Sequence, residues 1–237
     1  MNLLIKFFLN IFDHFTEKQI NKFLIKVFAR DIPIIVDVGS HKGEYISNIT
    51  KNFKFEIIYA FEPNPEIFQI LKKKFNNNNN IKINNFGIGD FNDVKILNNN
   101  LESSSTTFNQ LNTKSKYFKK KYFLLNPFKL KKIINPVKIE VIKLKKYIND
   151  NNINKIDLLK IDTEGYELKV LKGLEDNINL VNYIHLEHHF DDMIIKNYKL
   201  SDIHDYLKKN NFEKVFKIKM KFRKSFEYIY QNTKLNK

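Results

Sequence analysis

The segment from Ile32 to Tyr45, IPIIVDVGSHKGEY, restricts the possible folds of this chain more than any other. A short apolar run of mostly β-branched residues is followed by Asp37, Gly39 and Gly43 within seven residues. This order predicts a buried parallel strand, a tight turn and the start of a helix. Gly39 can adopt a backbone conformation that other residues avoid, and Gly43 would let the helix pack close to the strand. The segment therefore reads as the start of an α/β fold.

The glycine loop favours a ligand with a cationic group over a dinucleotide. The dinucleotide fingerprint is Gly-x-Gly-x-x-Gly, and His41 stands where its second glycine belongs. Asp37, just before the first glycine, suits a positive charge such as the amino or sulfonium group of S-adenosylmethionine (SAM). Because Asp-x-Gly-x-x-x-Gly also occurs in ordinary strand–helix turns, both interpretations stay open at this point.

Two further strands follow the first helix, which is expected over residues 43–52. The apolar runs Phe55–Phe61 and Ile81–Phe86 predict the strands, and the segment Glu66–Phe75 predicts the helix between them. Glu62, at a strand tip about twenty residues past the glycine loop, can accept two hydrogen bonds from ribose hydroxyls. This alternation predicts a doubly wound α/β half whose ligand lies across the carboxyl ends of the strands.

Composition limits the classes of function. The chain has 237 residues, no cysteine and a formal net charge of +15. The length predicts one domain, or one domain with an elaboration, and the absence of cysteine excludes disulfides and thiolate chemistry. Lysine and asparagine are spread through the whole sequence, whereas arginine occurs only at positions 30 and 223. Because arginine is the better bidentate reader of phosphate, we expect general attraction to anions but no sequence-specific nucleic-acid groove.

Residues 1–31 form a predicted N-terminal helical extension to one domain over residues 32–237. Apolar residues such as Leu4, Phe8 and Phe15 recur near helical spacing. Polar residues interrupt the run before it could cross a bilayer, and no basic start or small-residue cleavage site marks a signal peptide. The extension is expected either to pack on the domain or to lie as an amphipathic helix on a membrane surface.

The segment of about residues 91–154 differs from its surroundings. It contains a Ser/Thr cluster at 103–107, a mixture of lysine and aromatic residues at 117–132, and an alternating run, Val137–Leu144, that predicts a half-exposed strand. We interpret it as an inserted hairpin or lid over the ligand edge. Its lysines could contact an anionic substrate, or the segment could be a solvated surface with aromatic anchors.

The stretch Ile156–Gly173, IDLLKIDTEGYELKVLKG, predicts a buried strand, a loop and a helix start. Asp162 and Glu164 lie in the loop at the strand's carboxyl end, next to a glycine. Carboxylates are costly to bury without a role, so both are candidate functional residues. For Glu164 the alternative is a carboxylate that a helix dipole stabilises at a helix start.

A later strand, Val181–Phe190, carries Glu187, His188 and His189. Alternate residues of a strand share a face, so Glu187 and His189 should point together and His188 the other way. The histidines could also be a hydrogen-bonded structural pair at a strand end. A closing antiparallel pair is expected over residues 212–218 and 225–230, after a helix over residues 201–210 with Ser201 as N-cap.

The motifs VDVGSHKGEY, FEPNP, LLKIDTEGYELKVLKG and LEHHF, in this order and spacing, resemble those of the FkbM-type SAM-dependent methyltransferases. The resemblance covers about residues 32–190, and DTEGYE followed by Leu-Lys-Gly is its most specific part. Ser40 stands where alanine is usual, and Leu144-Lys145 replaces the usual Leu-Asp. The resemblance implies a class I methyltransferase fold: a Rossmann-like, seven-stranded, mostly parallel sheet with an antiparallel last strand and helices on both faces.

The resemblance also implies SAM as cofactor and O-methylation, often of a sugar or another hydroxyl in a secondary metabolite or surface glycan. By position, the glycine loop would hold the methionine part, the acid after the second strand the ribose, and the motif after the third strand the adenine. The corresponding residues are Asp37, Gly39, Ser40 and Gly43 for methionine, Glu62 for ribose, and Gly89 and Asp90 for adenine.

Methyl transfer to an alcohol is an in-line displacement that depends on positioning and is helped by a base near the hydroxyl. His189 is the first candidate base, with Glu187 to orient it, because histidine can be neutral at working pH. Asp162 is the alternative base, or the group that fixes the acceptor hydroxyl. A third possibility is a divalent cation that lowers the pKa of the hydroxyl. Its candidate ligands are Asp162, Glu164, Glu187 and His188.

The sequence thus predicts an O-methyltransferase acting on a carbohydrate. The alternatives are a methyltransferase for RNA ribose and a non-catalytic SAM-binding protein of a glycan pathway. The expected partner is a small molecule or glycan that bears a hydroxyl, with peripheral membrane contact through the N-terminal helix as a further expectation. The expected location is the cytoplasm, and the alternative is a peripheral position on the inner face of the membrane.

Overall fold

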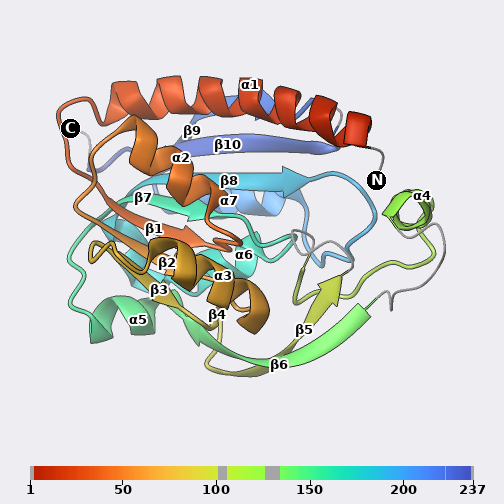
Figure 1. The fold of residues 1–237 in the computed structure, drawn as a ribbon. Helices are drawn as coiled ribbons and strands as arrows, with labels where there is room; N and C mark the ends of the chain where they lie inside the picture. The colour runs from red at the N-terminus through yellow and green to blue at the C-terminus, as the bar shows by residue number, and fades with distance from the viewer. Residues whose placement is uncertain (1–2, 101–105, 126–133, 222, 236–237) are drawn as a thin grey trace.

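The computed structural model describes residues 3–100, 106–125, 134–221 and 223–235. Its core is a seven-stranded sheet with the order β3-β2-β1-β7-β8-β10-β9 (Figure 1). Strands β3, β2, β1, β7 and β8 run parallel, and β10 is antiparallel to both of its neighbours. The strands are β1 (Ile34–Val38), β2 (Ile57–Phe61), β3 (Ile81–Asn84), β7 (Ile156–Ile161), β8 (Val181–His189), β9 (Phe212–Lys219) and β10 (Ser225–Asn232).

Helices cover both faces of the sheet because each strand buries side chains on both sides. The helices are α1 (Leu3–Val27), α2 (Glu44–Asn52), α3 (Pro65–Phe75), α4 (Lys116–Leu125), α5 (Leu144–Asp150), α6 (Glu167–Lys172), α7 (Leu200–Lys209) and a short 3₁₀ helix, Glu175–Leu180. Leu24 of α1, Ile46 of α2 and Leu71 of α3 share one buried cluster with Ile35. On the other face, α5, α6 and α7 pack against neighbouring residues such as Val36. This is the predicted doubly wound α/β fold.

The paired strands bring the carboxyl ends of β2, β1, β7 and β8 to one edge. The registers place Asp37 opposite Ala60 of β2 and opposite Lys160 of β7, and Lys160 opposite His185 of β8. Side chains of alternate residues share a face, so these three polar residues lie on the face that α1 and α2 cover. Polar groups therefore gather on one face near the carboxyl edge.

A second sheet of three strands stands beside the first (Figure 1). Its strands are β4 (Gly87–Gly89), β5 (Asp93–Asn100) and β6 (Ile134–Lys143), in the order β4-β6-β5. Strands β5 and β6 pair antiparallel, as the inserted hairpin requires. The Ser/Thr residues 103–105 and residues 126–133 of the lysine-rich stretch lie outside the described residues. Whether this segment works as a lid stays a prediction.

The predicted end of the third strand was wrong. The third strand was expected over Ile81–Phe86, but β3 ends at Asn84, and Gly87 starts a strand of the second sheet. Asn85 turns the chain there, because its side-chain amide donates to the carbonyls of Glu62 and Pro63.

The start of α7 also differs from the prediction. Ser201 was expected as its N-cap, but α7 begins at Leu200 with Lys199 in the N-cap position. The backbone N–H of Lys199 donates to the carboxylate of Asp202 at 2.7 Å, which is the contact that the third helical residue makes in a capping box.

The first helix, α1, runs lengthwise beside β9 and β10 (Figure 1). Ile20, Leu24 and Phe28 are buried against the sheet and α2. Within the described ranges, no helix is both long enough and apolar enough to cross a membrane.

Candidate functional site

The glycine loop is packed directly against the loop that follows β7. The backbone N–H groups of Gly39 and Ser40 both donate to the carbonyl of Phe61, at 3.0 Å each. Gly39 has a φ of 85°, and a Cβ there would lie 1.9 Å from the carbonyl oxygen of Asp162. Only glycine fits this position. The loop thereby joins the tips of β1, β2 and β7 into one rigid edge.

Asp37 is a buried carboxylate without a complete set of partners. Its side chain is 1% exposed, and its Oδ2 has no hydrogen-bond partner among the described residues. Burial raises the pKa of Asp37 to about 7, because the charged form has lost its hydration. A bound cationic group next to Oδ2 would supply the missing partner. The carboxylate is thus suited to a positively charged ligand, as the sequence predicted.

Glu62 connects the tip of β2 to the glycine loop. Its Oε2 accepts a hydrogen bond from the N–H of His41, and its Oε1 accepts one from the N–H of Asn64, both at 2.8 Å. Burial raises the pKa of Glu62 to about 7 despite these two donors. Each carboxylate oxygen has a further lone pair, so the carboxylate can also accept hydrogen bonds from a diol.

The predicted adenine residues are engaged elsewhere. Gly89 pairs with Lys143 of β6, and its carbonyl oxygen would lie 1.9 Å from a Cβ on Gly173. Asp90 forms an ion pair with Lys169 of α6 at 2.6 Å. Asn85, by contrast, contacts the backbone of Glu62 directly. The role of Gly89 and Asp90 stays a prediction, and Asn85 is a residue that the motif analysis missed.

A group of carboxylates surrounds His189 at the end of β8. Its Nε2 lies 3.3 Å from Glu187 and 3.5 Å from Glu164, and its Nδ1 lies 3.7 Å from Asp191. Glu164 reaches this position from the loop after β7, where it has a φ of 49°. The contact between His189 and Glu187 places both on one face, as the alternation predicted.

These carboxylates change the role that His189 can have. Burial opposes the charged form of His189, but the charges of Glu164 and Glu187 outweigh it and raise the pKa of the imidazole well above 6.5. A raised pKa favours the protonated imidazolium, which has no free nitrogen to accept a proton. His189 and Asp162 both stay predicted bases, and this shift favours Asp162.

Asp162 has the properties of a base at this edge. Its side chain is 37% exposed, so an acceptor can reach it. Burial of much of the carboxylate raises its pKa; the charge of Lys160 opposes this shift, while Glu187 and Glu227 add to it. A raised pKa makes a carboxylate a stronger base, which suits proton transfer from an alcohol.

A buried polar network lies behind Asp162, on the face that α1 and α2 cover. Lys160 Nζ lies 3.8 Å from Asp162 Oδ2 and 3.4 Å from Glu227 Oε2. His185 Nε2 lies 2.9 Å from the same Glu227 oxygen, and its Nδ1 is 3.3 Å from the hydroxyl of Tyr45. The neighbouring charges keep the pKa of Glu227 lowered to about 2 in spite of its burial. Ion pairs therefore fix the side chains that support Asp162.

Of the proposed metal ligands, Glu164 and Glu187 lie close to each other, but His188 does not join them. His188 points to the opposite face, where its ring lies against Phe190 and Tyr198, and burial lowers its pKa to about 3. Glu164 and Glu187 face His189 instead. In the part of the chain that the structure describes, no group of three or more His, Asp or Glu side chains could hold a metal ion. Metal dependence stays an open prediction.

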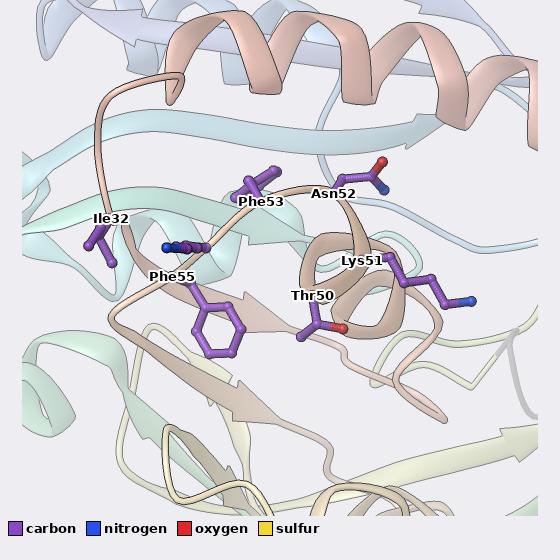
Figure 2. A pocket seen from close by; sticks show the side chains of 7 residues that line it. Ile32, Thr50, Lys51, Asn52, Phe53 and Phe55 are labelled. Carbon is purple, nitrogen blue, oxygen red and sulfur yellow. The ribbon is translucent and has the colours of Figure 1, made fainter.

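A shallow hollow lies at the opposite edge of the sheet (Figure 2). Its lining consists of Ile32 and residues 50–55, which precede β1 and β2. None of these residues is acidic or a histidine. The hollow brings no catalytic groups together, so the candidate site remains at the carboxyl edge.

The ion pairs of His189 predict a pH dependence of stability. Because the folded pKa is raised above the unfolded value of 6.5, their contribution is fully present below pH 6.5 and is lost as the pH rises through the folded pKa. Urea unfolding of the wild type, measured at a series of pH values from 6.5 upward, should show a free energy of unfolding that falls as the pH rises. His189→Gln should flatten the curve, whereas His14→Gln, at an exposed position, should not. Equal slopes for wild type and His189→Gln would contradict the ion pairs.

The geometry agrees with the comparison to known proteins. Residues 37–214 match the model of the methyltransferase FkbM domain. The chain belongs to the FkbM methyltransferase family. This membership confirms the family predicted from the motifs, and the strand order together with the antiparallel β10 confirms the class I methyltransferase fold.

Relatives of this FkbM chain include a curated protein and two solved structures. "Methyltransferase 1" of Beauveria bassiana is 26% identical over 152 residues, which are 62% of this chain and 60% of the relative. The FkbM methyltransferase structure from Methylobacillus flagellatus KT has a TM-score of 0.55 at 18% identity and covers 84% of this chain and 43% of that one. A SAM-dependent methyltransferase structure from Aquifex aeolicus has a TM-score of 0.48 at 12% identity. The match covers 90% of this chain and 89% of that one. The chain thus spans less than two thirds of the first two relatives.

Proposed function

We propose that this chain transfers a methyl group from SAM to a hydroxyl group of a sugar in a glycan or secondary metabolite. The observation that carries the proposal is the set of acidic groups at successive strand tips. Glu62, Asp37, Asp162 and Glu187 come from the neighbouring strands β2, β1, β7 and β8, so they lie in sequence along one edge. The first two suit a cofactor, and the last two suit an acceptor that carries several hydroxyls.

The residues of the loop fit SAM. Asp37 presents a buried oxygen that lacks a partner among the described residues, next to a loop where only glycine fits. A cationic methionine part would satisfy it, and ribose hydroxyls would donate to Glu62. SAM bound there would supply an electrophilic methyl group. The chain's own contribution is to hold the cofactor and acceptor in line, which is most of the catalysis in such a displacement.

Asp162 is the residue that we assign as base. In this displacement the acceptor oxygen would bond to the methyl carbon while the methyl–sulfur bond of SAM breaks and releases S-adenosylhomocysteine, and the carboxylate of Asp162 would take up the hydroxyl proton. Lys160 and the network behind it fix the position of this carboxylate. His189 remains an imidazolium and holds Glu164 and Glu187 in place. These carboxylates can accept hydrogen bonds from the other hydroxyls of a sugar.

The acidic lining favours a neutral, hydroxyl-rich acceptor over RNA, because phosphate would meet Glu164 and Glu187 at the site. The test is transfer of labelled methyl from SAM to a panel of glycosides and to bulk RNA. Transfer of label to glycosides would support the proposal, provided that the transfer stops when the hydroxyls of the glycosides are blocked. Incorporation into RNA with steep salt dependence and none into glycosides would replace it with the RNA alternative.

A further inference from the structure

Three exposed phenylalanines lie on elements near the carboxyl end of β8. Phe15 of α1, Phe123 of α4 and Phe190 after β8 are 53%, 66% and 50% exposed. Phe190 follows the last residue of β8, and its ring lies against His188 and Phe226, on the face opposite that of Glu187 and His189. Large aromatic side chains are costly to leave in water, and several on one side of a molecule indicate a contact surface.

Residues between β9 and β10 contact Phe15, Phe190 and the helix that carries Phe123. Lys221 Nζ lies 5.9 Å from the ring centre of Phe15, and Lys224 Nζ lies 5.6 Å from that of Tyr117 in α4. The N–H of Phe190 donates to the carbonyl of Lys224 at 2.6 Å. Phe15, Phe123, Phe190, Lys221 and Lys224 are called the aromatic rim below.

Helix α4 is fixed to the same edge. Phe118 is buried against Met193 and Ile194, which follow β8. Ser115 Oγ donates to Asp192 at 2.6 Å. Figure 1 shows α4 and the beginning of α1 on the side to which β8 points. Helix α4, which carries Phe123, is therefore held near the carboxyl end of β8.

The chemistry of the rim fits an anionic bilayer. Aromatic side chains enter the interfacial layer, while lysines next to them are attracted to anionic headgroups. The net charge of +15 adds long-range attraction to a negative surface. A groove that follows nucleic-acid phosphates would be expected to use arginine, and the chain has only two.

We propose that the aromatic rim seats the mouth of the site on an anionic lipid bilayer. This orientation would give the enzyme access to hydroxyls that are carried at a membrane surface. The contact involves only the rim, and it needs neither SAM nor an acceptor. A binding measurement on the full chain therefore tests it independently of methyl transfer.

The test is co-sedimentation with phosphatidylcholine vesicles, with and without phosphatidylglycerol. Phe15→Gln/Phe123→Gln removes two exposed rim side chains that lie in helices, without touching the site. The matched control is Ile25→Gln/Ile70→Gln, two exposed helical positions of α1 and α3 that lie outside the rim. We expect binding only to the anionic vesicles, weakened about tenfold in the rim variant and unchanged in the control.

Four results would overturn the proposal. These are no binding to either vesicle, equal binding to both, rim-variant binding equal to that of the wild type, and equal loss in both variants. Binding of single-stranded RNA that depends on the rim, without vesicle binding, would assign the surface to nucleic acid instead.

Discussion

Asp162→Asn is expected to lower kcat by roughly 10²–10⁴-fold, because asparagine cannot accept the hydroxyl proton. The amide has nearly the shape of the carboxylate, so SAM affinity and the melting temperature should change little. The measurement is the initial rate of methyl transfer at saturating SAM and acceptor. The matched control is Asp150→Asn, an exposed carboxylate of α5 that pairs with the surface lysine Lys146.

The pH profile separates a base from a residue that only fixes the acceptor. A base with a raised pKa gives a rate that falls as the pH drops through this pKa. The residual rate of Asp162→Asn should lack that acidic limb. His189→Gln should keep it, since the imidazolium does not take up the proton. A wild-type rate in Asp162→Asn, or an acidic limb lost only in His189→Gln, would contradict the assignment.

Glu62→Ala is expected to weaken SAM binding by at least about 10²-fold. Hydrogen bonds to a charged acceptor contribute about 1.5–3 kcal/mol each, and the variant loses both from the ribose. It also leaves the N–H groups of His41 and Asn64 without their acceptor, which loosens the loop. Glu62→Gln keeps one acceptor oxygen, so its affinity for SAM should lie between those of Glu62→Ala and the wild type. Calorimetric titration with SAM measures the affinity of each variant.

The control for Glu62→Ala is Glu56→Ala, which changes an exposed carboxylate just before the start of β2 and should leave SAM affinity unchanged. Wild-type affinity in Glu62→Ala would remove the ribose assignment.

The SAM affinity of the wild-type chain should weaken below pH 7. Burial raises the pKa of Asp37 and Glu62 to about 7, and the cofactor requires the ionised forms.

The sequence allowed most of the fold to be predicted because its strands are continuous apolar runs that end in polar loops. The β1 segment and its glycine loop, the acid after β2 and the β7–α6 stretch all lie where the pattern placed them. Asn85 was missed because a single asparagine after a strand has no distinctive spacing. Its role in ending β3 depends on the carbonyls of Glu62 and Pro63, which only the folded chain brings near.

The electrostatics of the site could not be predicted from the sequence. Glu187 and His189 share a face through strand alternation, so their contact was foreseeable. Glu164 and Asp191 come from two different loops, and with Glu187 they raise the pKa of His189. Lys160 and Glu227 are 67 residues apart and meet only through the pairing of β7, β8 and β10.

Calorimetric titration of the wild-type chain with SAM, beside a matched titration with NAD, tests whether the carboxyl edge of the sheet binds SAM. We expect saturable, roughly micromolar binding of SAM, weaker at pH 5.5 than at pH 8, and no binding of NAD. An absence of SAM binding at either pH, or NAD binding as tight as that of SAM, would show that this edge is not a SAM site.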